Sequence, residues 1–322
     1  MIRPAPQASP LPPEEPPEVC ILMAVYNGAA HLDEQLDSFA AQSHPAWSLI
    51  ASDDGSRDDS MARIAEFAAR HPGRSIRCRP GPRRGFVRNF LSLLEDVPEG
   101  VPYAAFSDQD DVWFPDKLAR ATAALSAVPA DRPAVYCAAT FVCQTDLRPL
   151  GPSSRLPRPP DFRNALVQSI GGGHTMVLNR AAIALAAGAA RRAPDPVVHD
   201  WWLYQLITGC GGVILRDPDP VLHYRQHGAN LIGANITGRA RLSRILALVS
   251  GRFRRWNHIN LAALAPIERD FTPEARHTLA HFRAARQGRV WHRLRHLRAS
   301  GVYRQSRIGS TALYLACLLG RL

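Results

Sequence analysis

The sequence predicts an α/β protein in which a mainly parallel sheet is flanked by helices and followed by a basic helical extension. Short apolar runs alternate with helix-like segments in the first third of the 322 residues. Their connections are short, which is typical of a helix-covered parallel sheet. After Gly233 the pattern changes to arginine among apolar residues at helical spacing. The length fits one large domain with an appendage or two modest domains.

The expected strands are compact apolar runs that end in turn residues. They cover residues 19–25, 47–51, 76–79, 103–106, 134–144, 175–178, 213–215 and 221–224. The last two flank an Asp-Pro-Asp-Pro sequence, which predicts a turn between two short strands. The expected helices have apolar residues on one face. They cover residues 31–42, 61–70, 86–94, a segment that begins at Pro115, and 199–207. A Pro-rich loop is expected at 151–162.

The positive charge is concentrated in the tail. The whole chain carries a formal net charge of +11, with 46% hydrophobic and 21% charged residues, which are the proportions of a globular protein. Residues 237–322 contain 17 arginines, no lysine and three acids, a charge of +14. The preceding residues therefore sum to −3, so the body is nearly neutral. We expect three segments: a disordered Pro-rich leader at 1–18, the main domain at 19–236 and a basic helical region at 237–322.

The cysteines and the hydropathy pattern indicate an intracellular protein. Six cysteines are scattered without CxxC pairs or zinc-like histidine spacing, so we expect reduced, mostly buried thiols. The N-terminal segment lacks the apolar core of a signal peptide. No apolar run reaches the roughly 20 residues that span a bilayer.

An acidic cluster follows the strand expected at 103–106. Asp108, Asp110 and Asp111 occupy three of four consecutive positions. Like charges this close destabilise one another unless a cation or proton intervenes. Hard oxygen ligands on a short turn suit Mg²⁺ or Mn²⁺, which often share substrate phosphates. The alternative is an acidic turn that caps the helix beginning at Pro115.

Three polar clusters each follow a predicted strand. Tyr26 and Asn27, Asp53 and Asp54, and the acidic cluster at 108–111 all fall at carboxyl ends of strands. Ligands bind at this edge of a parallel sheet, so we expect the three clusters to converge on one site. Taken alone, Asp53 and Asp54 are also good turn residues before a helix cap.

Three further motifs have both a functional and a structural interpretation. Residues 199–202, His-Asp-Trp-Trp, resemble a sugar site with a carboxylate beside aromatic rings, or a helix start followed by core aromatics. Residues 223–227, His-Tyr-Arg-Gln-His, place a cation and imidazoles where they suit an anionic leaving group, or are structural. The glycines at 171–173 do not match a P-loop; they favour close approach of the backbone to a bound ligand.

The ordered motifs resemble a known family. They are Ala-Val-Tyr-Asn-Gly at 24–28, Ser-Asp-Asp-Gly-Ser at 52–56, Ser-Asp-Gln-Asp-Asp-Val-Trp at 107–113, His-Asp-Trp-Trp at 199–202 and Tyr-Arg-Gln-His at 224–227. Together they are similar to inverting family-2 glycosyltransferases with the GT-A fold. They are most similar to the rhamnosyltransferase-like branch, which builds O-antigens and rhamnose-rich polysaccharides. The resemblance covers residues 19–234.

The resemblance implies a set of residues that bind the nucleotide-sugar. By analogy with the family they are Ala24, Tyr26, Asn27, Asp53, Asp54, Arg88, Asn89, Asp108, Trp201, Arg225 and His227. Those at 24–27 would line the nucleotide pocket, and those at 53–54 would contact the base or ribose. Arg88 and Asn89 would lie against the nucleotide, and Arg225 and His227 would steady the diphosphate.

The resemblance also implies a metal pair and a general base. Asp108 and Asp110 match the DxD pair that holds Mg²⁺ or Mn²⁺, with Asp110 as the direct ligand, whereas Asp111 supports the loop. Asp200 matches the second acid of the family's Glu-Asp pair and would deprotonate the acceptor hydroxyl. His199 stands where many relatives have Glu, which leaves the role of that position open.

The implied activity is metal-dependent transfer of a sugar, such as L-rhamnose from dTDP-L-rhamnose, to a hydroxyl of a growing, lipid-linked bacterial polysaccharide. One alternative is a noncatalytic nucleotide-sugar or glycan-binding protein with the same fold. Another is a metal-dependent phosphohydrolase, which is disfavoured because no aspartyl nucleophile motif follows the first strand. The arginine-rich tail would attach the cytoplasmic protein to the anionic inner face of the membrane. The tail could instead be a solvated helical region packed on the core. We expect no nucleic acid partner, because no such motif is present.

Overall fold

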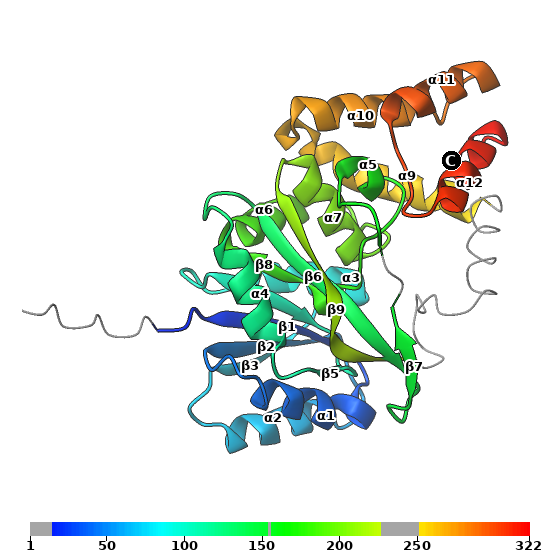
Figure 1. The fold of residues 1–322 in the computed structure, drawn as a ribbon. Helices are drawn as coiled ribbons and strands as arrows, with labels where there is room; N and C mark the ends of the chain where they lie inside the picture. The colour runs from blue at the N-terminus through cyan, green and yellow to red at the C-terminus, as the bar shows by residue number, and fades with distance from the viewer. Residues whose placement is uncertain (1–14, 154–155, 227–250) are drawn as a thin grey trace, which may run out of the picture.

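The computed structural model describes residues 15–153, 156–226 and 251–322. Their strands form one sheet of nine strands, in the order β3-β2-β1-β4-β8-β6-β9-β5, with β7 paired to β6 (Figure 1). The strands are β1 (Val19–Val25), β2 (Trp47–Asp53), β3 (Ile76–Pro80), β4 (Tyr103–Ser107), β5 (Val112–Trp113), β6 (Ala134–Cys143), β7 (Pro149–Pro152), β8 (Val177–Asn179) and β9 (Val213–Arg225).

The helices alternate with these strands in the first half of the chain. They are α1 (Ala29–Ala40), α2 (Ser60–Arg70), α3 (Phe86–Leu93), α4 (Lys117–Ser126), α5 (Phe162–Ala165), α6 (Arg180–Ala190), α7 (His199–Gly209), α9 (Arg252–Leu264), α10 (Pro273–Ala284), α11 (Val290–Ser300) and α12 (Arg307–Leu318). Short 3₁₀ segments are η1 (Leu94–Asp96), η2 (Gly173–Thr175) and η3 (Ala265–Asp270). The predicted α/β class is confirmed.

The sheet is mixed rather than wholly parallel. Strands β3, β2, β1 and β4 pair in parallel, as the alternating pattern predicted. Beyond β4 the short strand β8 lies antiparallel to both β4 and β6. Residues 213–225 form one strand instead of two, because shifts in the register of its pairing with β6, between 138 and 141, accommodate the Asp-Pro-Asp-Pro sequence. Prolines are tolerated in strands at such irregularities.

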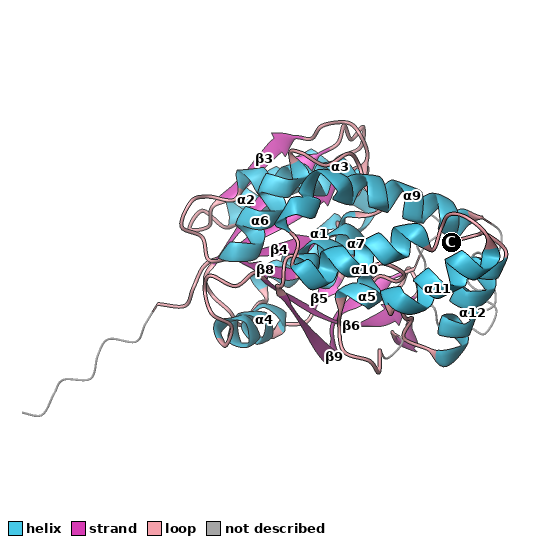
Figure 2. Cartoon of the chain, turned by 90° about the horizontal axis from the view of Figure 1, so that it is seen from above, coloured by secondary structure: helices cyan, strands magenta, loops and turns pink. Residues whose placement is uncertain are grey.

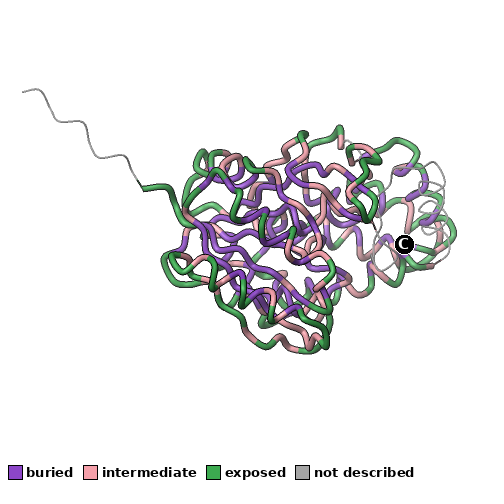
Figure 3. The backbone as a smooth tube through the Cα atoms, turned by 90° about the horizontal axis from the view of Figure 1, so that it is seen from below, coloured by how far each residue is buried: buried purple, intermediate pink, exposed green. Residues whose placement is uncertain are grey.

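Helices cover both faces of the sheet. Alternate residues of β1 point to opposite faces, as the strand period requires. Ile21 and Met23 join an apolar cluster with α1, α2 and α4. Cys20 and Leu22 join a second cluster with α3, α6 and α7. Figure 2 shows α6 and α7 above the strands, and Figure 3 shows buried backbone running through the centre of this body.

The described tail helices pack on the second of these clusters. Buried residues of α9, α10, α11 and α12 belong to the same apolar cluster as α6 and α7. Within the basic helical region, residues 273–300 form two helices, α10 and α11, and Gly288 in the connection between them has φ +77. Gln305, between α11 and α12, donates to Asn164 Oδ1 of α5 at 3.2 Å, and Arg304 donates to the carbonyl of Val167 at 2.6 Å. These contacts attach the tail to the body.

Two expected features fall partly or wholly outside the described residues. The leader predicted at 1–18 is described only from residue 15 onward, and the predicted domain boundary at 236/237 lies in the segment 227–250. All six cysteines are free thiols, and four of them are buried. In the described part of the chain, no helix combines the length and the hydropathy needed to cross a membrane.

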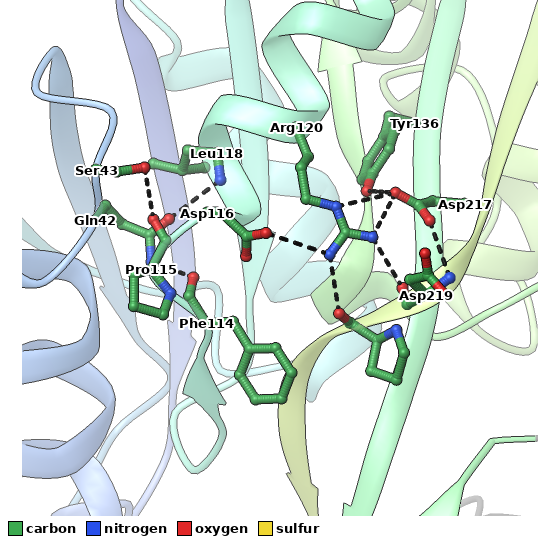
Figure 4. A network of polar contacts seen from close by, with 11 residues as sticks. Gln42, Ser43, Phe114, Pro115, Asp116, Leu118, Arg120, Tyr136, Asp217 and Asp219 are labelled. Atoms are coloured by element: carbon green, nitrogen blue, oxygen red, sulfur yellow. Dashed lines mark hydrogen bonds and ion pairs between the residues drawn. The ribbon is translucent and has the colours of Figure 1, made fainter.

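A polar network anchors the segment that follows the acidic cluster (Figure 4). Gln42, after α1, donates to the carbonyl of Phe114 at 2.8 Å and accepts from the N–H of Leu118 at 3.1 Å. On the other side, Arg120 donates to Asp217 of β9 at 2.6 Å and to the carbonyl of Pro220 at 3.0 Å. Burial opposes ionisation of Asp217, but hydrogen bonds from Tyr136 and Arg120 outweigh it and lower the pKa of this carboxyl.

Candidate active site

The predicted clusters after β1 and β4 are joined by one side-chain amide. The N–H of Tyr26 donates to Gln109 Oε1 at 2.8 Å, and Gln109 Nε2 donates back to the carbonyl of Tyr26 at 3.0 Å. Gln109 therefore ties the acidic turn to the turn after β1. Only the place of Gln109 inside the acidic motif could have indicated this role.

The turns after β1 and β2 are also linked. Asn27 has φ +49, in the left-handed region that Asn tolerates better than most residues. Its N–H donates to Ser56 Oγ at 2.9 Å, and its Oδ1 accepts from the N–H of Arg57 at 2.8 Å. Asp53 Oδ1 accepts from the N–H of Ser56 at 3.0 Å. The convergence of all three polar clusters at one edge of the sheet is thus present in the structure.

Asp54 and Asn89 hold the loop that precedes α3. Asp54 accepts from the backbone N–H groups of Arg83 at 2.6 Å and Gly85 at 2.7 Å. Asn89 is buried and donates from Nδ2 to the carbonyl of Ser52 at 2.8 Å. Both residues organise the part of the sheet edge where the nucleotide is predicted to bind. Their direct contact with a nucleotide stays a prediction.

Arg88 has partners that the sequence did not indicate. Its Nε donates to Asp195 Oδ1 at 2.6 Å, and its terminal nitrogens donate to the carbonyls of Ala190 and Ala193, both at 3.2 Å. The guanidinium thus connects α3 to the end of α6. Its predicted contact with the nucleotide is untested and would have to compete with these bonds. Ala24, near the end of β1, is partly buried against the core.

The acidic cluster meets an imidazole from a distant part of the chain. Ligand atoms of Asp108, Asp111 and His174 all lie within 4.8 Å of one another. His174 Nδ1 is 3.1 Å from Asp108 Oδ2 and 3.8 Å from Asp111 Oδ2. Burial opposes protonation of His174, but the two carboxylates outweigh it and raise the pKa of His174 to about 9. The same partnership overcomes burial to lower the pKa of Asp108. His174 was not among the predicted site residues.

Two ionisable residues at this site, Asp111 of the acidic cluster and Lys117 of α4, are inaccessible to solvent. Burial, together with the charges of Asp110 and Asp108, raises the pKa of Asp111 well above its usual value. Burial lowers the pKa of Lys117, whose ammonium donates to the carbonyl of His174 at 2.6 Å and lies 3.1 Å from the ring centroid of Trp113. The first turn of α4 therefore places a buried lysine beside the carboxylates, and the sequence pattern did not predict this.

The donor set fits a divalent cation. Among the described residues, neither carboxylate oxygen of Asp111 has a hydrogen-bond partner, although both are buried. Buried polar atoms without partners are rare, and a bound proton, water or ion is the usual explanation. Carboxylate-dominated sites suit Mg²⁺ and Mn²⁺. Asp110, the predicted direct ligand, is half-buried and lies outside the three-residue set, so its ligand role stays a prediction.

The glycines at 171–173 make room for two histidine rings. A Cβ on Gly172 would lie 2.4 Å from His174 Cε1, and a Cβ on Gly173 would lie 2.2 Å from His199 Nε2. Real Cβ atoms do not approach heavy atoms this closely, so a larger residue at either position would displace a ring. The close approach expected here is therefore to the protein's own rings in the described structure.

Asp200 lies in the first turn of α7. Its Oδ2 accepts from the N–H of Gly173 at 3.1 Å, and His174, the next residue, contacts Asp108. The segment η2 thus connects the predicted base to the acidic cluster. Burial raises the pKa of Asp200 to about 6, although hydrogen bonds from the N–H groups of Trp201 and Gly173 oppose this. A carboxyl with this pKa is well suited to accept a proton near neutral pH.

His199 is enclosed by aromatic rings. It stacks on Phe90 with centroids 4.1 Å apart and makes edge contacts with Phe86 and Phe106. Burial lowers the pKa of His199 to about 4, so the ring is neutral. A carboxylate at this position would be poorly stabilised in such a cage.

The tryptophans of α7 are core residues. Trp201 is 5% exposed and donates from Nε1 to the carbonyl of Ala165 at 2.6 Å, and Trp202 is fully buried. This packing matches the alternative of a helix start followed by core aromatics. Sugar binding by Trp201 stays untested, and its burial does not favour it.

Arg225 ends β9 and is almost fully buried. It forms an ion pair with Glu34 of α1 and donates to the carbonyl of Thr145 at 2.6 Å. The neighbouring Tyr224 stacks on His174 with centroids 4.8 Å apart, so this part of β9 borders the acidic cluster. The other predicted diphosphate ligand, His227, lies outside the described residues.

Known proteins with similar sequences are glycosyltransferases. A model of the family described as Glycosyl transferase family 2 matches residues 20–183. The dTDP-rhamnosyl transferase RfbG of Shigella flexneri is 30% identical over 242 residues, which cover 72% of this chain and 81% of that protein.

Solved structures agree on the fold. The mannosyltransferase PcManGT from Pyrobaculum calidifontis, in complex with GDP-Man and Mn²⁺, matches with a TM-score of 0.52 at 20% identity, over 91% of this chain and 88% of that one. TarS 1–349 of S. aureus, in complex with UDP-GlcNAc, matches with a TM-score of 0.51 at 13% identity, over 93% and 90%. The chain therefore belongs to glycosyl transferase family 2, and it is a rhamnosyltransferase-like, inverting glycosyltransferase with the GT-A fold.

Proposed function

We propose that the protein is a metal-dependent enzyme that transfers L-rhamnose from dTDP-L-rhamnose to a hydroxyl of a growing bacterial polysaccharide. The observation that carries the proposal is the link made by η2. Gly173 holds the carboxylate of Asp200, and the adjacent His174 contacts Asp108 of the acidic cluster. A base and a candidate diphosphate site are thus fixed relative to one another, as a one-step displacement requires.

Asp200 acts as the general base. Its carboxylate accepts the proton of the acceptor hydroxyl while that oxygen forms a bond to the anomeric carbon. The bond between the anomeric carbon and the diphosphate oxygen breaks at the same time, and the nucleoside diphosphate leaves from the opposite face. The configuration at the anomeric carbon is therefore inverted. The pKa of about 6 keeps Asp200 deprotonated at neutral pH while leaving it basic enough to accept the proton.

Asp108 and Asp110, with Asp111 and His174 beside them, would hold Mg²⁺ or Mn²⁺. When bound, the cation neutralises charge that develops on the leaving diphosphate. Arg225 adds fixed positive charge at the neighbouring end of β9, and Tyr26, Asn27, Asp53 and Asp54 shape the nucleotide side of the edge. The donor is assigned from the relative of Shigella flexneri, which is named as a dTDP-rhamnosyl transferase.

A donor panel tests the assignment. The purified chain is incubated with Mn²⁺ and dTDP-L-rhamnose, GDP-mannose or UDP-GlcNAc, and both thermal stabilisation and release of nucleoside diphosphate are measured. We expect the largest upward shift of the melting temperature, and the fastest hydrolysis, with the dTDP sugar, because saturating ligands stabilise the native state. Stabilisation without turnover of any donor would favour the alternative, a noncatalytic nucleotide-sugar or glycan-binding protein.

We also propose that the acceptor is lipid-linked and that the tail places the enzyme on the inner face of the cytoplasmic membrane. Ile308, Leu315 and Leu319 recur at positions i, i+7 and i+11, on one face of α12 and its C-terminal cap. They are 68%, 47% and 56% exposed. Arg307 flanks them, and the tail carries a large positive charge. Exposed apolar residues bordered by arginine suit an anionic lipid surface.

A further inference from the structure

The tail contains a group of histidines that the transfer reaction does not use. His277 and His281 lie four residues apart on α10, and His292 and His296 lie four residues apart on α11. Residues at this spacing share one face of a helix. The two helices are joined by a five-residue connection and pack against one another. Two histidine pairs therefore face a common boundary, and we refer to these four residues as the histidine cluster.

The four rings form a continuous row. Centroids are 4.5 Å apart for His277 and His281, 4.9 Å for His281 and His296, and 4.4 Å for His292 and His296. At the centre, Nδ1 of His281 lies 2.7 Å from Nδ1 of His296. The two central rings are half-buried and the two outer rings are exposed. The outer rings can therefore reorient without disturbing the packing of the hairpin.

The central contact requires at least one neutral ring, because one nitrogen must accept the proton that the other donates. The surroundings of His296 disfavour its protonation. Burial between the helices, followed by the charges of His292, His281 and Arg295, lowers the pKa of His296. Neutral imidazole is the form that binds metals. In a tail with a charge of +14, four adjacent imidazoles would repel one another if protonated.

We propose that the histidine cluster binds one borderline transition-metal ion of the Zn²⁺ class, with His281 and His296 as the central ligands and with His277 and His292 completing the set after their side chains rotate toward the central pair. Imidazole nitrogen is a preferred ligand of such ions, whereas it is a poor substitute for oxygen around Mg²⁺. Two nitrogens on a tetrahedral Zn²⁺ with bonds of about 2.0–2.1 Å lie roughly 3.3 Å apart. The central pair at 2.7 Å needs to separate by less than 1 Å.

The ion would connect α10 to α11 across their shared boundary. Helix pairs that share a metal gain stability by the full binding free energy, because the separated helices do not present the site. The hairpin packs against α5 and α7 and is continuous with α12, so stiffening it would fix the position of the apolar face on α12. This site is chemically and spatially separate from the acidic cluster that would hold Mg²⁺ or Mn²⁺.

Calorimetric titration of the metal-stripped, untagged full chain with ZnCl₂, in excess Mg²⁺, tests the proposal. Excess Mg²⁺ occupies sites built from hard oxygen ligands. We expect one site of micromolar or tighter affinity, weakened at least tenfold in the double variant His281→Gln/His296→Gln. The single variant His277→Gln, at an exposed position, should weaken it less. His258→Gln, at an exposed histidine on α9 outside the cluster, is the matched control and should bind as the unaltered chain does.

Two further measurements check that the variants fold and that the ion has tetrahedral coordination. Circular dichroism of the metal-free double variant checks that it folds; if it does not, the His277→Gln and His292→Gln variants carry the test. Co²⁺ substitution should give the visible absorption bands of a tetrahedral site. Absence of a Zn²⁺ site in the unaltered chain, or equal affinity in the control and the cluster variants, overturns the proposal. Turnover of the dTDP sugar with Mg²⁺ should be unchanged in the cluster variants, so this result is independent of the proposed transfer reaction.

Discussion

The sheet-edge site and the C-terminal helices both gather ionisable residues, but they place them in opposite environments. At the sheet edge Asp111, Lys117 and His174 are buried against one another, and their pKa values are displaced from the usual range. On the tail, most arginines lie at the surface beside exposed apolar residues such as Trp291, at 82%. Buried charges are expensive unless they are paired or used. This contrast is what we would expect if the first region carries out the proposed reaction and the second forms the proposed membrane contact.

The largest effect is expected at the base. Asp200→Asn should lower the transfer rate by about 10²–10⁴-fold, because the amide cannot accept the proton of the acceptor hydroxyl. Donor affinity should stay close to that of the unaltered enzyme. Steady-state rates and calorimetric titration with the donor measure the two quantities. Asp219→Asn, at an exposed carboxylate of β9, is a suitable control. Normal turnover by Asp200→Asn would contradict the assignment of the base.

A second pair of variants asks which carboxylates hold the cation. Asp110→Ala should abolish the Mn²⁺-dependent part of donor binding, whereas Asp111→Asn should leave it measurable. The reason is that Asp110 is half-buried and is the predicted direct ligand, whereas burial raises the pKa of Asp111 and so opposes the charged form that would bind a cation. Calorimetry with and without Mn²⁺ gives the comparison. The reverse result would assign the ion to the set of Asp108, Asp111 and His174.

The sequence predicted the first strands of the sheet better than the contacts between residues at its edge. The strands at 19–25 and 47–53 were predicted to within two residues at every boundary, because compact apolar runs that end in turn residues are strong signals. His174 was missed, since it is 66 residues from Asp108 and reaches it only through the antiparallel strand β8. Single-sequence patterns do not specify such long-range pairings.

The sequence also could not predict that the tryptophans of α7 are buried in the core. Helix α7 is apolar on nearly all sides, because it is covered by both the body and the tail. Its sequence therefore has no polar face that would distinguish a core position from a ligand-facing one. The role of Arg88 could not be predicted either, because its partner Asp195 lies more than 100 residues away in the sequence. Its place in the motif indicated that it matters but not what it contacts.

The pH dependence of the transfer rate tests whether a buried carboxyl at the sheet edge, rather than a group on the tail, limits the reaction. Burial raises the pKa of Asp200 to about 6, and the base is active only when deprotonated. The rate should therefore be constant above pH 7 and fall as the pH drops through about 6, approaching a tenfold loss per unit below it. Rates measured between pH 5 and 8 at saturating donor check this. A flat profile would show that no carboxyl with this pKa limits the reaction.

The network in Figure 4 should affect stability before it affects chemistry. Arg120→Met removes the bonds to Asp217 and Pro220 and leaves a partly buried carboxylate with fewer donors. We expect a loss of about 1–3 kcal/mol in the free energy of unfolding, measured by urea denaturation. Arg148→Met removes an arginine whose ion pair with Asp146 is well exposed, and it should change stability little. Equal losses in the two variants would show that the network does not anchor this segment.

The smallest effect is expected on the tail, and it decides what the tail contacts. Ile308→Glu and Leu315→Glu place charge on the exposed apolar face of α12 without touching the sheet edge. Flotation with liposomes that contain anionic lipid should fall several-fold in the double variant, because less apolar surface enters the interface. Ala280→Glu and Thr278→Glu on α10 add the same charge elsewhere and serve as the control. Equal flotation of the two double variants would assign the effect to net charge alone. Transfer to a soluble acceptor should be unchanged throughout, since the tail is proposed to position the enzyme and the sheet edge to perform the reaction.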